Sequence, residues 1–113
     1  MASIENNFNN DKVPENEILK YNIPTLIEVR AEWSGGSHLM DLIVNKIEKE
    51  YHQEINIVRI DYEAHKELLN NLGIDKVPAF LFINNGEIVE VVKETLSRRN
   101  LERIIGRLYH KQS

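Results

Sequence analysis

Residues 25–37 read TLIEVRAEWSGGS, and this stretch decides the fold. Its first seven residues are rich in β-branched and apolar side chains, which predicts a strand over residues 25–31 with Glu28 and Arg30 inside it. The letters WSGGS that follow combine glycine and serine in the way that is typical of a turn. Beyond them, apolar residues recur with a helical period over residues 37–52. The chain therefore passes from a strand through a glycine turn into a helix.

The helix predicted over residues 37–52 carries apolar side chains on one face. They stand at positions i, i+3, i+4, i+7 and i+11, in the order Met40, Ile43, Val44, Ile47 and Tyr51. Leu39 and Leu42 widen this face, so we expect the helix to be well buried.

The other elements alternate between strands and helices. Strands are predicted over residues 55–61, 79–83 and 87–92, and helices over residues 15–21, 63–72 and 98–110. Asn85-Gly86 marks a tight hairpin between the last two strands. Strand–helix–strand crossovers imply parallel pairing, and the hairpin adds an antiparallel pair. The sequence thus predicts an α/β fold with a mixed central β-sheet and helices on both faces, in a single domain over residues 13–113 after a flexible lead-in over residues 1–12.

Composition excludes several classes of function. The formal net charge is −4, whereas a dedicated nucleic-acid binder would be basic. No apolar run approaches the length of a membrane span, and the polar N-terminus has no signal-peptide core, so we expect a cytoplasmic protein that binds neither nucleic acid nor membrane. The chain has no cysteine, which rules out disulfides, thiolate metal sites and a cysteine nucleophile.

Three short motifs occur in a fixed order. The first is AEW (31–33) followed by the tetrad SGGS, the second is GIDKVP (73–78) before the apolar strand, and the third is NGE (85–87). In this order and spacing they resemble the thioredoxin family over about residues 14–110. The resemblance implies the thioredoxin fold, with Val77-Pro78 at the family's cis-proline position.

The resemblance also shows what is missing. The family's activity needs a Cys-x-x-Cys dithiol after the tryptophan, but Ser34 and Ser37 occupy both cysteine positions and Gly36 replaces the proline between them. A serine hydroxyl cannot take the place of the thiolate that attacks a disulfide. Glu28 falls where the family has a buried acid beneath the second cysteine, a role that is idle without a thiol. We therefore expect no disulfide exchange and no catalytic residue in the chain as written.

Several interpretations of the two serines remain open. Ser34 is placed to cap the helix, which stabilises a helix by about 1 kcal/mol. It could instead bind glutathione or another thiol at the electropositive helix N-terminus. The pair could also be a laboratory Cys-to-Ser change in a protein-disulfide oxidoreductase, although Gly36 and the other departures from the family favour natural divergence.

By the same resemblance, a protein or peptide client binds a groove between Trp33 and Pro78. Its residues are those that match the family's groove, namely Trp33, Gly35, Gly36, Lys76, Val77, Pro78 and Glu94. Lys76 and Glu94 make the rim bulkier and charged, and they could pair across it, so we expect a narrower choice of partner. We expect a monomer without cofactor or metal.

Arg30 stands where the family usually has a large apolar or aromatic residue, on the same strand face as Glu28. Two interpretations are equally good: a partly buried pair with Glu28 that extends to Asp61, or a side chain that reaches solvent. Glu48 and His52 have the i, i+4 spacing of a metal chelate, but a solvated helix face is the simpler interpretation.

Overall fold

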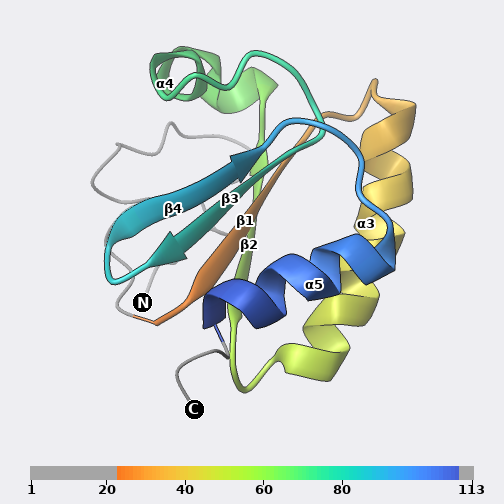
Figure 1. Cartoon of the computed structure of the whole chain (residues 1–113). Coiled ribbons are helices and arrows are strands. Elements are labelled where there is room, and N and C mark those ends of the chain that lie inside the picture. Colours follow the sequence, from red (N-terminus) through yellow and green to blue (C-terminus); the bar gives the residue numbers. More distant parts are fainter. Residues whose placement is uncertain (1–22, 110–113) are drawn as a thin grey trace, which may run out of the picture.

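The structure, a computed structural model, describes residues 23–109 (Figure 1). The elements follow the predicted order: β1 (Thr25–Arg30), α3 (Gly35–Tyr51), β2 (Asn56–Asp61), η1 (Glu63–His65), α4 (Lys66–Asn71), β3 (Ala79–Asn84), β4 (Glu87–Val92) and α5 (Arg98–Tyr109). The helix predicted over residues 15–21 and the lead-in over residues 1–12 lie outside the described residues.

The four strands form one mixed sheet in the order β2-β1-β3-β4, as Figure 1 shows. β1 pairs with β2 in parallel, whereas the pairs β1–β3 and β3–β4 are antiparallel. The turn between β3 and β4 contains Asn85 and Gly86 with φ angles of 56° and 77°. Positive φ at both central residues is what a two-residue hairpin turn of the favoured hand requires. The predicted mixed sheet is therefore confirmed.

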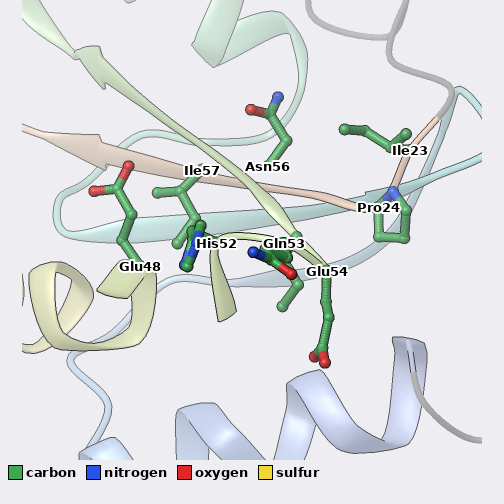
Figure 2. A pocket seen from close by; sticks show the side chains of 9 residues that line it. Ile23, Pro24, Glu48, His52, Gln53, Glu54, Asn56 and Ile57 are labelled. Carbon is green, nitrogen blue, oxygen red and sulfur yellow. The ribbon is translucent and has the colours of Figure 1, made fainter. Parts of the chain in front are cut away.

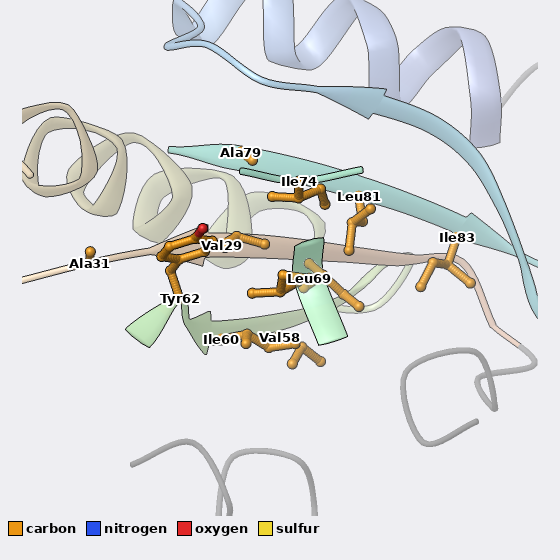
Figure 3. Packing of buried hydrophobic residues seen from close by; sticks show 11 residues of the cluster. Val29, Ala31, Val58, Ile60, Tyr62, Leu69, Ile74, Ala79, Leu81 and Ile83 are labelled. Carbon is orange, nitrogen blue, oxygen red and sulfur yellow. The ribbon is translucent and has the colours of Figure 1, made fainter. Parts of the chain in front are cut away.

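Alternate residues of β1 point to opposite faces of the sheet and enter two separate cores. Ile27, Val29 and, just after the strand, Ala31 belong to the core that Leu69 and Ile74 cover from the α4 side. Figure 3 shows this core around Val29. Leu26 belongs to the other core, where α3 and α5 contribute Met40, Val44, Ile47, Leu101 and Ile105. Because Glu28 and Arg30 alternate with the first set, they lie on the face that α3 covers. Helices thus cover both faces of the sheet, as predicted.

Two details of the helices differ from the prediction. Leu39 and Leu42 do not widen the buried face of α3, because their side chains are 52% and 63% exposed. The helix packs on the sheet with a narrower stripe of Met40, Val44 and Ile47. The helix predicted over residues 63–72 is divided into a 3-10 turn, Glu63–His65, and the short α4.

Candidate functional site

Ser34 and Ser37 both stabilise the start of α3. Ser34 is the N-cap, and its Oγ accepts a hydrogen bond from the Ser37 backbone N–H at 3.0 Å. The Ser37 side chain is fully buried, and its Oγ accepts from the Ala31 backbone N–H at 3.1 Å. The Ser34 backbone N–H in turn donates to the Ala31 carbonyl at 3.1 Å. The two hydroxyl oxygens therefore satisfy backbone donors around the start of this helix.

Gly36 brings two further loops into contact with the start of α3. A Cβ atom at this position would lie 3.0 Å from Pro78 Cδ and 3.2 Å from Thr95 Cγ2. The Val77-Pro78 peptide bond is cis, and Pro78 is buried just before β3. Gly36, Pro78 and Thr95 thus lie close against one another, and a side chain at position 36 would force its neighbours to shift.

The two glycines of the tetrad are expected to respond in opposite ways to alanine. Gly35→Ala should raise the free energy of unfolding by about 0.5 kcal/mol, because nothing lies within 4 Å of the added Cβ and alanine favours the helix. Gly36→Ala should lower it by about 1 kcal/mol, because the Cβ would press on the rigid Pro78 ring. Urea unfolding of both variants measures the difference. Equal effects would contradict the close approach of Gly36 to Pro78.

Trp33 is the exposed aromatic residue of this surface, with 65% of its area accessible. Its Nε1–H donates to Glu63 Oε2 at 2.9 Å, and Lys66 Nζ lies 3.3 Å from the other carboxylate oxygen. The Trp33 and Lys66 contacts lower the pKa of Glu63, so the acceptor stays ionised. The indole is therefore held at one edge while much of it remains open to solvent.

The predicted pair between Lys76 and Glu94 is wrong for the described residues. Both side chains are exposed, and no ion pair or hydrogen bond joins them within residues 23–109. The loop after β4 is instead joined to the loop after α4 by the neighbouring lysine, because Lys93 Nζ donates to the Gly73 carbonyl at 3.1 Å. Lys76 and Glu94 thus remain available as charges on the rim.

Glu28 lies on the face of β1 that α3 covers and is completely buried. Arg59 Nε on β2 is 3.4 Å from Glu28 Oε1, but neither carboxyl oxygen has a hydrogen-bond partner of good geometry among residues 23–109. Burial, followed by the nearby Asp41 carboxyl, raises the pKa of Glu28 to about 8 against the opposing charges of Arg59 and Arg30. Glu28 therefore carries a proton at pH 7.

Both interpretations of Arg30 from the sequence are wrong. Its Nε donates to both carboxylate oxygens of Asp41, at 3.0 and 3.1 Å, and its other contact is Glu32, 3.5 Å away. The Arg30 side chain is only 11% exposed, so it does not reach far into solvent, and none of its ion pairs within residues 23–109 is with Glu28 or Asp61. The reason is geometric: the second turn of α3 places Asp41 over the end of β1. Burial opposes ionisation of Asp41, but Arg30 outweighs it and lowers the pKa of that carboxyl.

Asp41, Glu63 and Thr95 are the contacts that the sequence interpretation missed. A buried arginine needs an acid, and Asp41 stands four residues after Ser37 on a helix that had to face β1, so a search of that helix would have found it. The sequence offers no comparable signal for Glu63, which meets Trp33 from thirty positions away.

A hollow lies at the other end of β1, beside Ile23 and Pro24. It has a volume of about 270 Å³, and Figure 2 shows Glu48 and His52 on one side of it and Ile23 and Pro24 on the other. Glu48 pairs with Arg59 at 3.3 Å, and His52 Nδ1 lies 3.2 Å from the Lys49 carbonyl. Residues 23–109 contain no cluster of three or more potential metal ligands and no helix long and apolar enough to cross a membrane.

Comparisons with known proteins agree with this geometry. The family model for thioredoxin matches residues 5–107. Thioredoxin from Rickettsia bellii is 27% identical over 77 residues, covering 68% of this chain and 73% of its own length, and thioredoxin from Porphyra purpurea is 24% identical over 91 residues, covering 80% and 85%. The structure of a mutant thioredoxin from Halobacterium salinarum has a TM-score of 0.77 at 19% identity, with 88% of each chain covered.

The oxidised mitochondrial thioredoxin 3 of Saccharomyces cerevisiae has a TM-score of 0.74 at 19% identity, covering 82% of this chain and 86% of its own. These likenesses establish the thioredoxin-like fold. Because the chain has no cysteine, the dithiol chemistry of the family is excluded. The chain belongs to the thioredoxin family, and without a thiol it cannot perform dithiol–disulfide exchange.

Proposed function

We propose that this protein is a non-catalytic binding module that holds an extended segment of a client protein. The binding surface consists of Trp33, Gly35, Gly36, Val77 and Pro78 and is called the Trp33–Pro78 surface below. The observation that carries the proposal is the close approach of Gly36 to Pro78 and Thr95, which brings two loops against the start of α3 beside an exposed tryptophan. An exposed aromatic residue on a rigid platform is a frequent anchor in protein interfaces.

The hydrogen bonds at the start of α3 support a binding role over a chemical one. The Ser34 hydroxyl caps the helix and the Ser37 hydroxyl binds the Ala31 N–H, so both act as structural parts of the platform. The case for a glutathione site at Ser34 is weaker, because the Ser34 side chain is turned to the helix N–H and the residue is only 7% exposed. Lys76 and Glu94 add charge to the rim and favour a narrower choice of client than a generic apolar one.

The alternative of a laboratory Cys-to-Ser change receives little support from the relatives. The thioredoxins from Rickettsia bellii and Porphyra purpurea share only about a quarter of their residues with this chain over the matched region. Neither of them therefore differs from it only at positions 34 and 37. Arg30, which departs from the family's usual apolar residue, binds Asp41, and this favours divergence of the site beyond positions 34 and 37.

Trp33→Ala is the variant that tests the proposal. With a fluorescently labelled, reduced and carboxymethylated insulin B chain as the probe, anisotropy should show binding to the unaltered protein. The dissociation constant should rise about tenfold or more in the variant, because an aromatic anchor is removed. The probe has no free thiol, so the result does not depend on redox chemistry.

Leu42→Ala is the matched control for this experiment. Leu42 on α3 is 63% exposed, almost the same fraction as Trp33, but lies outside the Trp33–Pro78 surface. It should leave the dissociation constant unchanged. If the two variants weaken binding equally, or Trp33→Ala has no effect, the proposed function is wrong.

A further inference from the structure

We propose that the outer edge of β4 and the adjoining cleft between β4 and α5 bind the client by strand addition. This inference rests on the proposed function, because the cleft begins where the Trp33–Pro78 surface ends. Thr95 packs against Gly36 in that surface, and its two neighbours, Glu94 and Leu96, line the cleft. A segment bound over Pro78 would therefore continue directly into it.

The cleft is large enough for one apolar side chain. It has a volume of about 280 Å³, and its apolar lining comes from Val92 on β4, Leu96 in the loop and Ile104 on α5. Its polar lining comes from Glu90, Glu94, Asn100 and Arg103. At the far end, Arg107 on α5 binds Glu90 on β4 at 2.8 Å and joins the two elements.

The backbone of β4 is open along this cleft. β4 ends the sheet, and no strand within residues 23–109 pairs with its outer edge. Its register with β3 shifts between Phe82 and Ile83, which leaves Val89 without an opposite residue. The regular part of the edge is therefore residues 90–92, beside the cleft, and it includes the exposed side chain of Val91. Unpaired strand edges of this kind readily accept an extended segment.

The charges indicate the sequence of that segment. Neither Glu94 nor Arg103 has an ion pair among the described residues, so each is available to a partner of opposite charge. Alternate side chains of a strand point to the same face. The fitting segment thus has an apolar residue that enters the cleft, and a basic and an acidic residue on the same face that can meet Glu94 and Arg103.

A blocked peptide with the core Lys-Ser-Leu-Ser-Glu tests this inference on the full chain labelled with nitrogen-15. Titration should shift the amide signals of residues 90–96 and 100–104. Replacing the peptide leucine by serine should weaken binding about tenfold or more, because the buried apolar side chain is lost. Replacing the peptide lysine by glutamine should weaken it up to about fivefold, and this effect should vanish in the Glu94→Gln protein. Arg103→Gln should likewise abolish the effect of the peptide glutamate.

The inference is overturned if the peptide at millimolar concentration shifts no amide signal of β4 or α5. It is also overturned if the two charge replacements in the peptide weaken binding equally in the original protein and in the Glu94→Gln and Arg103→Gln variants. Its failure is distinguishable from that of the proposed function. If Trp33→Ala loses insulin B-chain binding but the peptide shifts no amide signal of β4, only the proposed binding at the cleft is refuted. Peptide shifts in β4 together with an inert Trp33→Ala replacement refute the Trp33–Pro78 surface alone.

Discussion

Glu28→Gln is expected to remove a loss of stability that the protein otherwise suffers as the pH rises. The pKa of Glu28 is about 8 in the folded chain, against an ordinary value of 4.5. Between these values the folded state holds a proton that the unfolded state has released, so the free energy of unfolding falls as pH increases. The loss amounts to about 1.4 kcal/mol for each pH unit in this window, with an upper limit of about 5 kcal/mol above pH 8. Below about pH 4.5 this loss is absent, because both states are protonated.

Glutamine has nearly the shape of the protonated acid and cannot ionise. The variant should therefore match the original protein near pH 4.5 and exceed it by several kcal/mol at about pH 9. Arg59 would keep its contacts with Glu48 and Asn45, at 3.3 and 2.6 Å, so it would not be left unpaired.

Urea unfolding at pH 5, 7 and 9 measures the effect, with Glu32→Gln as the control. Glu32 also lies near Arg30, but its side chain is 83% exposed, so its replacement should leave the pH dependence almost unchanged. Parallel stability curves for Glu28→Gln and the original protein would show that Glu28 ionises normally in the fold.

The elements of this fold could be predicted because each has a local cause. The spacing of Met40, Val44 and Ile47 places one helical face on the sheet, and Asn85-Gly86 determines a hairpin through its backbone conformation alone. Leu39 and Leu42 show the limit of this reasoning. Apolar character predicted their burial, but whether the side of a helix is covered depends on elements that are distant in the sequence. In this protein no described element covers Leu39 and Leu42 fully, so both are exposed.

The site was only partly predictable for a similar reason. The cap at Ser34 follows from its place before a helix, and the contact of Gly36 with Pro78 agrees with the motif order. The charged contacts depend on side-chain direction across elements, which sequence spacing does not determine. Glu28 and Arg30 share a strand face, yet each has its nearest charged neighbour on another element: Arg59 on β2 lies 3.4 Å from Glu28, and Asp41 on α3 binds Arg30.

Removing one partner of the Arg30–Asp41 pair should lower the free energy of unfolding strongly, whereas replacing both residues together should change it little. Asp41→Ala should lower the free energy of unfolding by about 2–3 kcal/mol, because it leaves the largely buried Arg30 guanidinium without its main partner. The effect stays below that of a fully buried pair, since the Asp41 side chain is 26% exposed and Glu32 remains 3.5 Å from Arg30. Arg30→Leu with Asp41→Ala should recover most of the loss, because an apolar pair needs no counterion.

A double-mutant cycle in urea at pH 7 separates these effects. Arg30→Leu alone should also destabilise, since it leaves the Asp41 carboxylate beside the buried Glu28 without its cation. Glu102→Ala, which removes an exposed ion pair with Arg98 on α5, should change stability little. Additive effects of the two replacements would mean that Arg30 and Asp41 act independently. A strong coupling would mean that Arg30 and Asp41 stabilise the fold as one charge pair between β1 and α3, so that neither can be replaced alone without loss.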